Sequence, residues 1–261
     1  MEWKNFEYEA FIYLKTKYGG FFKLNGESDS TQSDIIYENR SEKFYIEVKM
    51  PVAQSGQFVL IEDKINKQFF YSCKNKTEVN PYSTAIIDYI NLNYQYYSDV
   101  NSAGKEIILD KDIFYNWIVR HYEKKNVRFF ITRYNDKFLL FHIKDFSKYF
   151  NVKAIFRLKK SGSRHITEND KIILKEILKY NINFHFEGTN IISNYNLDRK
   201  KIQNEEKTYY FRKIDINKYS VTKLSNTNNA NVIFSIELHK ELKQEINHVA
   251  KENLKIPKLK L

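Results

Sequence analysis

The segment FYIEVKMP, residues 44–51, decides how the first part of this chain is interpreted. It predicts a β-strand, and an extended chain alternates its side chains between two faces. Ile46 and Val48 therefore share one face, and Glu47 and Lys49 share the other. Pro51 ends the strand, because proline cannot donate a hydrogen bond to a β-ladder. The glutamate and the lysine are either a solvated surface pair or part of a functional site.

The surroundings of Glu47 matter more than the Glu-Val-Lys tripeptide itself. An acidic residue stands two positions before a lysine at six other places in the chain, all in polar stretches or near predicted helix ends. Glu47 alone lies within an apolar run. A charged pair in such a run needs a cleft or a partner to solvate it.

A second carboxylate precedes this strand by thirteen residues. The stretch DIIYE (34–38) predicts a strand, and NRS (39–41) predicts the turn of a hairpin near Arg40. Pairing about that turn brings Asp34 close to residues 46–48. Two neighbouring carboxylates repel each other unless a divalent cation or a shared proton relieves them. Hard oxygen ligands of this kind suit Mg²⁺, and a nearby lysine could polarise a water or stabilise charge on a phosphate. The alternative is that Asp34 is a turn residue and Glu47–Lys49 a surface pair.

Residues 2–18, EWKNFEYEAFIYLKTKY, predict an amphipathic helix that places Phe6, Ala10, Tyr13 and Leu14 on one side. The order of a helix with a glutamate, a strand with an aspartate and a strand with Glu-x-Lys resembles the PD-(D/E)xK nuclease superfamily over residues 5–50. The resemblance implies that Asp34, Glu47 and the carbonyl of Val48 bind Mg²⁺ and that Lys49 is the catalytic lysine. It implies Glu7 as the helix glutamate, with Glu9 as the rival. Ser33 stands where members of the superfamily usually have proline.

Two groups of enzymes share parts of this pattern. The loop serines of SDSTQSD (28–34) are similar to those of archaeal Holliday-junction resolvases, and the layout as a whole is similar to many restriction endonucleases. The resemblance also places Gln54, Ser55 and Gln57 where polar residues lie near the scissile phosphate.

Composition excludes several other classes of protein. Cys73 is the single cysteine, which excludes an intramolecular disulfide and favours a reducing, cytoplasmic setting. The first residues have neither the basic nor the apolar region of a signal peptide, and no apolar run approaches about 18 residues. The six histidines are scattered without metal-ligand spacing, and no Gly-Lys-Ser/Thr loop is present to bind a nucleotide phosphate.

The positive charge lies mainly in the second half of the chain. Residues 1–150 carry 21 Lys and Arg against 20 Asp and Glu, whereas residues 151–261 carry 22 against 12. This excess predicts a polyanionic partner, and nucleic acid is the commonest one. The densest basic loop, RLKKSGSR (157–164), makes Lys159, Lys160, Ser163 and Arg164 candidates for DNA contacts. A solvated turn is the alternative for each of these residues.

These observations predict an α/β fold in which a central mixed β-sheet is flanked by helices, with a basic α+β C-terminal extension. Residues 1–150 would form the nuclease core and residues 151–261 the DNA-recognition region. Further helices are expected over 81–98, 110–125 and 167–180, and a last one with Leu242, Ile246 and Val249 on one face. Further strands are expected over 127–143 around the Asn135-Asp136 turn, and over 152–158, 209–224 and 232–238. QFVLI (57–61) fits either a strand or the start of a helix.

The expected function is Mg²⁺-dependent, sequence-specific cleavage of double-stranded DNA, as in type II restriction enzymes. Cutting both strands of a palindrome favours a homodimer. Two alternatives stay open at this point. One is a nuclease that recognises a DNA structure such as a Holliday junction, and the other is a DNA-binding protein without catalytic activity.

Overall fold

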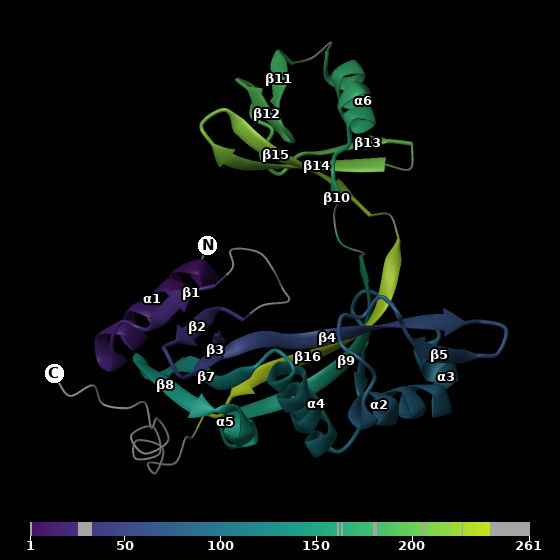
Figure 1. Cartoon of the computed structure of the whole chain (residues 1–261). Helices are drawn as coiled ribbons and strands as arrows, with labels where there is room; N and C mark the ends of the chain where they lie inside the picture. Colours follow the sequence, from purple (N-terminus) through teal and green to yellow (C-terminus); the bar gives the residue numbers. More distant parts are fainter. Residues whose placement is uncertain are drawn as a thin grey trace. The chain divides into compact units, whose positions relative to one another are not determined.

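The chain divides into two compact units in a computed structural model that describes residues 2–25, 33–160, 162, 164–179, 182–205, 207–225 and 227–240 (Figure 1). The first unit runs to Arg157 and resumes at Ala230, and the second spans Leu158–Asn229. These bounds differ from the expected division at residue 150. The basic region is an insertion, because the chain returns to the first unit in the strand that was expected over 232–238.

The first unit holds three long helices, two short helical segments, a 3₁₀ turn and ten strands among its described residues. The helical elements are α1 (Glu2–Tyr18), α2 (Pro81–Leu92), α3 (Tyr94–Tyr97), α4 (Lys111–Glu123), η1 (Ile143–Asp145) and α5 (Phe146–Tyr149). The strands are β1 (Phe22–Leu24), β2 (Ile35–Glu38), β3 (Lys43–Val48), β4 (Val52–Asp63), β5 (Gln68–Tyr71), β6 (Lys105–Ile107), β7 (Val127–Tyr134), β8 (Lys137–His142), β9 (Phe150–Lys160) and β16 (Asn228–Leu238).

The first sheet has the order β1-β2-β3-β7-β8 and is mixed, because β3 and β7 are parallel and its other neighbours are antiparallel. Helix α1 packs on one face of this sheet. Phe6, Ala10 and Leu14 recur at helical spacing and are buried against Ile46 and Val48 of β3. The apolar alternation of β3 therefore determines which face α1 covers, and it leaves Glu47 and Lys49 on the other face.

The second sheet of this unit has the order β5-β4-β16-β9-β6. Helix α4 lies between the two sheets, since Trp117 stacks on Phe234 of β16 at 4.1 Å between ring centroids and Tyr122 meets Phe130 of β7 at 5.0 Å. Asp110 caps the start of α4 by accepting a hydrogen bond from the Asp112 amide. The structure thus has two sheets in this unit where one central sheet was expected.

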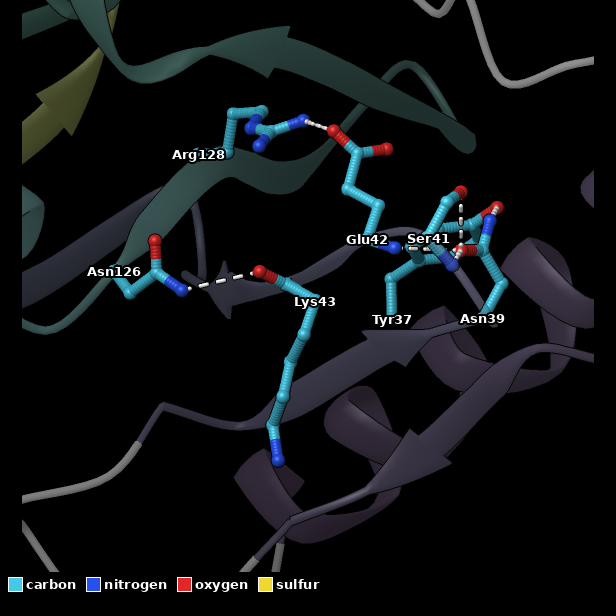
Figure 2. Close-up of polar contacts among 7 residues, drawn as sticks. All are labelled: Tyr37, Asn39, Ser41, Glu42, Lys43, Asn126 and Arg128. Carbon is cyan, nitrogen blue, oxygen red and sulfur yellow. Dashed lines mark hydrogen bonds and ion pairs between the residues drawn. The ribbon is translucent and has the colours of Figure 1, made fainter.

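The turn that closes the β2–β3 hairpin is fixed by a polar network (Figure 2). The Asn39 side chain accepts hydrogen bonds from the amides of Ser41 and Glu42 and donates one to the Tyr37 hydroxyl at 2.7 Å. The Arg128 guanidinium at the start of β7 pairs with the Glu42 carboxylate. This network sets the register of β2 against β3 and ties the hairpin to β7.

The second unit has its own sheet, in the order β11-β12-β15-β14-β13, with β10 paired to β15. Its strands are β10 (Arg164–His165), β11 (Phe184–Glu187), β12 (Asn190–Ser193), β13 (Lys201–Asn204), β14 (Lys207–Asp215) and β15 (Lys218–Leu224), and its helix is α6 (Glu168–Leu178). Leu174 and Leu178 of α6 are buried against Tyr209, Phe211 and Val221 of the sheet.

Most of the expected elements are present. The hairpin around Asn135 and Asp136 has both turn residues at positive φ, and Thr167 and Asp170 form the expected capping box of α6. QFVLI lies within strand β4. The expected last helix, with Leu242, Ile246 and Val249, lies outside the described residues.

Candidate active site

The antiparallel pairing of β2 and β3 brings Asp34 next to Glu47. Ile35 faces Ile46 and Ile36 faces Tyr45, so one more step of the register faces Asp34 with Glu47. The Asp34 Oδ2 atom accepts a hydrogen bond of 2.8 Å from the Val48 amide. The expected approach of Asp34 to residues 46–48 is confirmed.

Glu47 and Lys49 form a buried ion pair. The Lys49 Nζ atom lies 2.5 Å from the Glu47 Oε1 atom, and Glu47 is only 5% exposed. Burial excludes the alternative of a solvated surface pair. Among the described residues, the second carboxylate oxygen, Oε2, is buried without a hydrogen-bond partner. A buried carboxylate oxygen in this state is costly unless a ligand satisfies it.

The local electrostatics raise the pKa of both Asp34 and Lys49. Burial raises the pKa of Asp34 to about 7, and the neighbouring Glu47 carboxylate adds to the rise. Burial opposes the charge on Lys49, but the Glu47, Tyr122 and Asp34 side chains outweigh it and raise the pKa of Lys49 above its usual range. Lys49 is therefore an ammonium at neutral pH.

Of the two glutamates of α1 considered for this site, Glu7 is the one close enough for Glu47 and Lys49 to affect its pKa. It is half-buried, and burial raises its pKa, with Lys49 and Glu47 close enough to act on it in opposite directions. Glu9 is exposed and pairs with the Arg133 guanidinium. The position of Glu7 suits the predicted helix glutamate, and the position of Glu9 does not.

Tyr122 and Lys125 lie beside this cluster, and neither was predicted from the sequence to belong to the site. The Tyr122 side chain of α4 is buried, and the Ser55 hydroxyl donates to the Tyr122 hydroxyl at 3.4 Å. The Lys49 and Lys125 ammonium groups lie 5.8 Å and 5.2 Å from the centroid of the Tyr122 ring. Tyr122 occupies an ordinary apolar position in the pattern of α4, so no local signal in the sequence pointed to it.

The three polar residues predicted to lie near the scissile phosphate are at a bulge in β4. The pairing with β16 shifts register between Gln54 and Gln57, and Gly56 has a φ of +95°. The exposed Gln54 amide donates to the Gln57 side chain at 3.1 Å. Ser55 is fully buried and turned toward Tyr122, a position that does not suit a contact with DNA.

The predicted basic residues belong to the second unit, with Lys159 and Lys160 at the end of β9 and Arg164 in β10. Lys160 and Arg164 are exposed and Lys159 is half-buried. Ser163 lies outside the described residues. Their predicted DNA contacts stay predictions.

The donor atoms at the cluster fit a hard divalent cation. The Asp34 and Glu47 carboxylates are oxygen donors, and the Glu47 Oε2 atom is buried without a hydrogen-bond partner among the described residues. Mg²⁺ commonly uses one or two carboxylates and keeps several waters, so this set is sufficient. Within the described ranges, no group of three or more His, Cys, Asp or Glu side chains is placed to hold a metal.

Comparison with known proteins places the chain in a family. No protein-family model matches it, and no curated protein does. A solved structure of HhaI endonuclease in complex with DNA matches with a TM-score of 0.89 and 40% sequence identity, and the match covers 96% of each chain. The chain belongs to the HhaI endonuclease family.

Membership of the HhaI endonuclease family confirms the expected likeness to restriction endonucleases. The narrower PD-(D/E)xK motif and the similarity to Holliday-junction resolvases stay predictions from the sequence. Within the described part of the chain, no helix has the length and apolar character needed to cross a membrane.

Proposed function

We propose that this chain is a Mg²⁺-dependent endonuclease of restriction type, which cleaves phosphodiester bonds of double-stranded DNA at a specific sequence. The observation that carries the proposal is the buried cluster of Asp34, Glu47 and Lys49 at the ends of two paired strands. The 40% identity to HhaI endonuclease supports the assignment. The order of Glu7, Asp34 and Glu47-Val48-Lys49 supports a PD-(D/E)xK site.

In this proposal, Asp34, Glu47 and the Val48 carbonyl hold the cation. Mg²⁺ at that position supplies positive charge for the phosphate oxygens and lowers the pKa of a bound water. The protein keeps Lys49 as an ammonium, so Lys49 acts as a hydrogen-bond donor and a positive charge rather than as a base. It stabilises the negative charge that develops on the phosphate when the water oxygen bonds to phosphorus and the ester oxygen leaves with a proton.

Glu7 has a supporting role in this scheme. Its carboxylate lies near enough to Lys49 for the Lys49 charge to oppose the rise in the Glu7 pKa. Glu7 therefore balances the Lys49 charge while Glu47 serves the cation. The second unit would add phosphate contacts, because residues 158–229 carry 14 Lys and Arg against 8 Asp and Glu.

Plasmid and phage DNA test the proposal. The purified protein is incubated with each DNA in Mg²⁺ and, separately, in EDTA. Discrete fragments in Mg²⁺ alone support a sequence-specific endonuclease. Cleavage only of a synthetic four-way junction would indicate a structure-specific nuclease instead. Binding without cutting would indicate a DNA-binding protein and would contradict the proposal.

Variants connect the activity to the site. Lys49→Ala is expected to lower the cleavage rate by about 100-fold or more, because one charged donor to the phosphate is removed. Asp34→Asn and Glu47→Gln should abolish cutting while DNA binding persists. Lys43→Ala is the matched control, since Lys43 lies on the same strand but is exposed and pairs with Glu38 at 3.2 Å. A Lys43→Ala protein as inactive as Lys49→Ala would indicate damage to the strand rather than to the site.

The homodimer expected from palindromic cleavage stays a prediction. Its test is the molecular mass in solution with and without a cleavable duplex in Ca²⁺.

A further inference from the structure

A second lysine stands beside the candidate active site, on the turn that follows α4. The Lys125 amide donates to the Tyr122 carbonyl at 3.0 Å, and Asn126 turns the chain with a φ of +57°. Two hydrogen bonds fix this turn to β3. The Tyr45 amide donates to the Asn126 carbonyl at 3.0 Å, and the Asn126 side chain donates to the Lys43 carbonyl at 3.1 Å (Figure 2). These hydrogen bonds therefore hold the backbone next to Lys125 against the strand that carries Glu47.

The Lys125 side chain reaches the Tyr122 ring beside the cluster. Its ammonium lies 5.2 Å from the centroid of the Tyr122 ring, and the Lys49 ammonium lies 5.8 Å from the same centroid. Tyr45, Glu47 and Lys49 alternate onto one face of the sheet, and α1 covers the opposite one. Tyr45 and Lys125 are both half-buried, so each side chain is partly accessible to a ligand.

The Lys125 and Lys49 ammonium groups approach the same aromatic ring, and two cations at one site suit an anionic ligand. Burial lowers the pKa of Lys125, Lys49 adds to the decrease, and Glu47 and Asp34 oppose it without cancelling it. The surroundings without ligand therefore disfavour the ammonium form. An anion close to the Lys125 ammonium would favour its charged form. A backbone phosphate is such an anion, and lysine binds phosphate as a compact point charge.

We propose that the Lys125 ammonium binds the DNA phosphate that enters the site and, together with Lys49, holds it against Asp34 and Glu47. The inference rests on the proposed nuclease function. It assigns Lys125 a direct contact with the substrate, while Lys49, already in contact with Glu47, stabilises the charge that develops during cleavage.

Salt-dependent binding tests the contact without requiring cleavage. The association constant for a 20-base-pair duplex is measured in EDTA over a range of NaCl concentrations. Removal of one lysine that binds a phosphate reduces the slope of log K against log [NaCl] by about 0.9. Lys125→Ala should show this reduction and Lys125→Arg should not. Lys124→Ala is the control on the same turn, because Lys124 pairs with Glu78 at 2.8 Å, and it should keep the wild-type slope.

Cleavage separates a phosphate contact from a structural role. Under single-turnover conditions on plasmid DNA in Mg²⁺, Lys125→Ala should be at least about tenfold slower than wild type, and Lys125→Arg should recover most of the rate. Lys125→Met keeps the aliphatic stem over Tyr122, so it should fold normally and cleave as slowly as Lys125→Ala.

Three outcomes overturn the inference. If Lys125→Ala keeps both the wild-type slope and the wild-type rate while the wild-type protein cuts DNA, the inference fails and the nuclease function stands. If Lys125→Met restores the rate, the stem rather than the charge matters, and the inference again fails. If the wild-type protein neither cuts nor binds DNA, both proposals fail together.

Discussion

At the residue scale, Glu47 is distinguished by burial. Six other acidic residues also have a lysine two positions later. In the sequence, Glu47 differs from them because it lies in an apolar predicted strand. The structure adds the physical consequence. Glu47 is buried against Lys49 and has one oxygen without a hydrogen-bond partner among the described residues. Each charge of this buried pair is therefore compensated mainly by the other.

The stability of the Glu47–Lys49 pair provides the first prediction. Lys49→Met leaves the Glu47 carboxylate buried without its cation, which costs about 3–5 kcal/mol of unfolding free energy. The double variant Glu47→Gln/Lys49→Met removes both charges and should regain at least half of that stability. Urea unfolding in EDTA, applied to the wild-type protein, both single variants and the double variant, measures the free energies. Equal destabilisation in Lys49→Met and in the double variant would show that the pair is not coupled.

The raised pKa of Asp34 predicts how stability depends on pH in the absence of metal. The carboxyl has a pKa of about 7 in the folded chain against a usual value of 3.8, so the folded state binds the proton more tightly. The protonated Asp34 carboxyl contributes its full stabilisation of the folded state below about pH 4. This contribution is lost as the pH rises to 7, and the unfolding free energy falls by at most about 1.4 kcal/mol per pH unit. Between pH 5.5 and 8 in EDTA, the melting temperature should therefore fall.

Asp34→Asn should make this fall shallower, because asparagine does not titrate. Asp136→Asn is the control, since Asp136 is exposed in the β7–β8 turn and should keep the wild-type profile. Mg²⁺ favours the charged carboxylate, so it should raise the melting temperature more at pH 8 than at pH 5.5. A melting profile of Asp34→Asn that matches wild type would contradict the assignment of the titration to Asp34.

At the element scale, the bulge in β4 determines the shape of the site wall. The extra residue at Gly56 directs Ser55 inward to Tyr122 and leaves Gln54 exposed. An alanine at Gly56 would be strained at a φ of +95°, and its Cβ atom would lie 2.8 Å from the Trp117 ring. Strain and overpacking together should cost about 2–4 kcal/mol of unfolding free energy.

Urea unfolding of Gly56→Ala measures this cost. Gly20→Ala is the matched control, because a Cβ atom at Gly20 meets no other atom within 4 Å and the residue has no positive φ. It should change stability by less than about 0.5 kcal/mol. If Gly56→Ala is as stable as Gly20→Ala, the bulge is free to rearrange.

The elements also show how far the sequence predicts the site. The Asp34–Glu47 contact was predictable because a short hairpin fixes which residues face each other. The contacts of Ser55 and Lys49 with Tyr122 were not, since they join residues about 70 positions apart and depend on where α4 packs. The short strands β11, β12 and β13 were missed for a different reason. Each has only four residues, so its local pattern is weak.

At the scale of the whole molecule, the charge follows the units rather than the halves of the chain. Residues 158–229 have a net charge of +6, whereas the first unit, residues 1–157 and 230–261, has +5 over more than twice the length. The expected division at residue 150 assigned β9 and β16 to the basic region. The structure places most of both strands in the second sheet of the first unit, where they are neighbours.

The neighbouring positions of β9 and β16 predict that the second unit can be removed. The chain leaves the first unit after Arg157 and re-enters it at Ala230, in two strands of one sheet. A short Gly/Ser linker in place of residues 158–229 should therefore leave a first unit that unfolds cooperatively. The second unit carries its own core around Leu174, Tyr209 and Phe211, so its removal takes none of the core residues Phe6, Leu14 and Ile46 from the first unit.

The same deletion tests where the DNA affinity resides. If the basic insertion binds phosphates, the deleted protein should bind a 20-base-pair duplex more weakly, and its slope of log K against log [NaCl] should be smaller by about 0.9 for each phosphate that the insertion neutralises. Slow cleavage should persist at low salt, because Asp34, Glu47, Lys49 and Lys125 all lie in the first unit. A full chain with six Lys and Arg of residues 158–229 replaced by Gln should reproduce the weaker binding. Unchanged slopes in both proteins would assign the DNA contacts to the first unit alone.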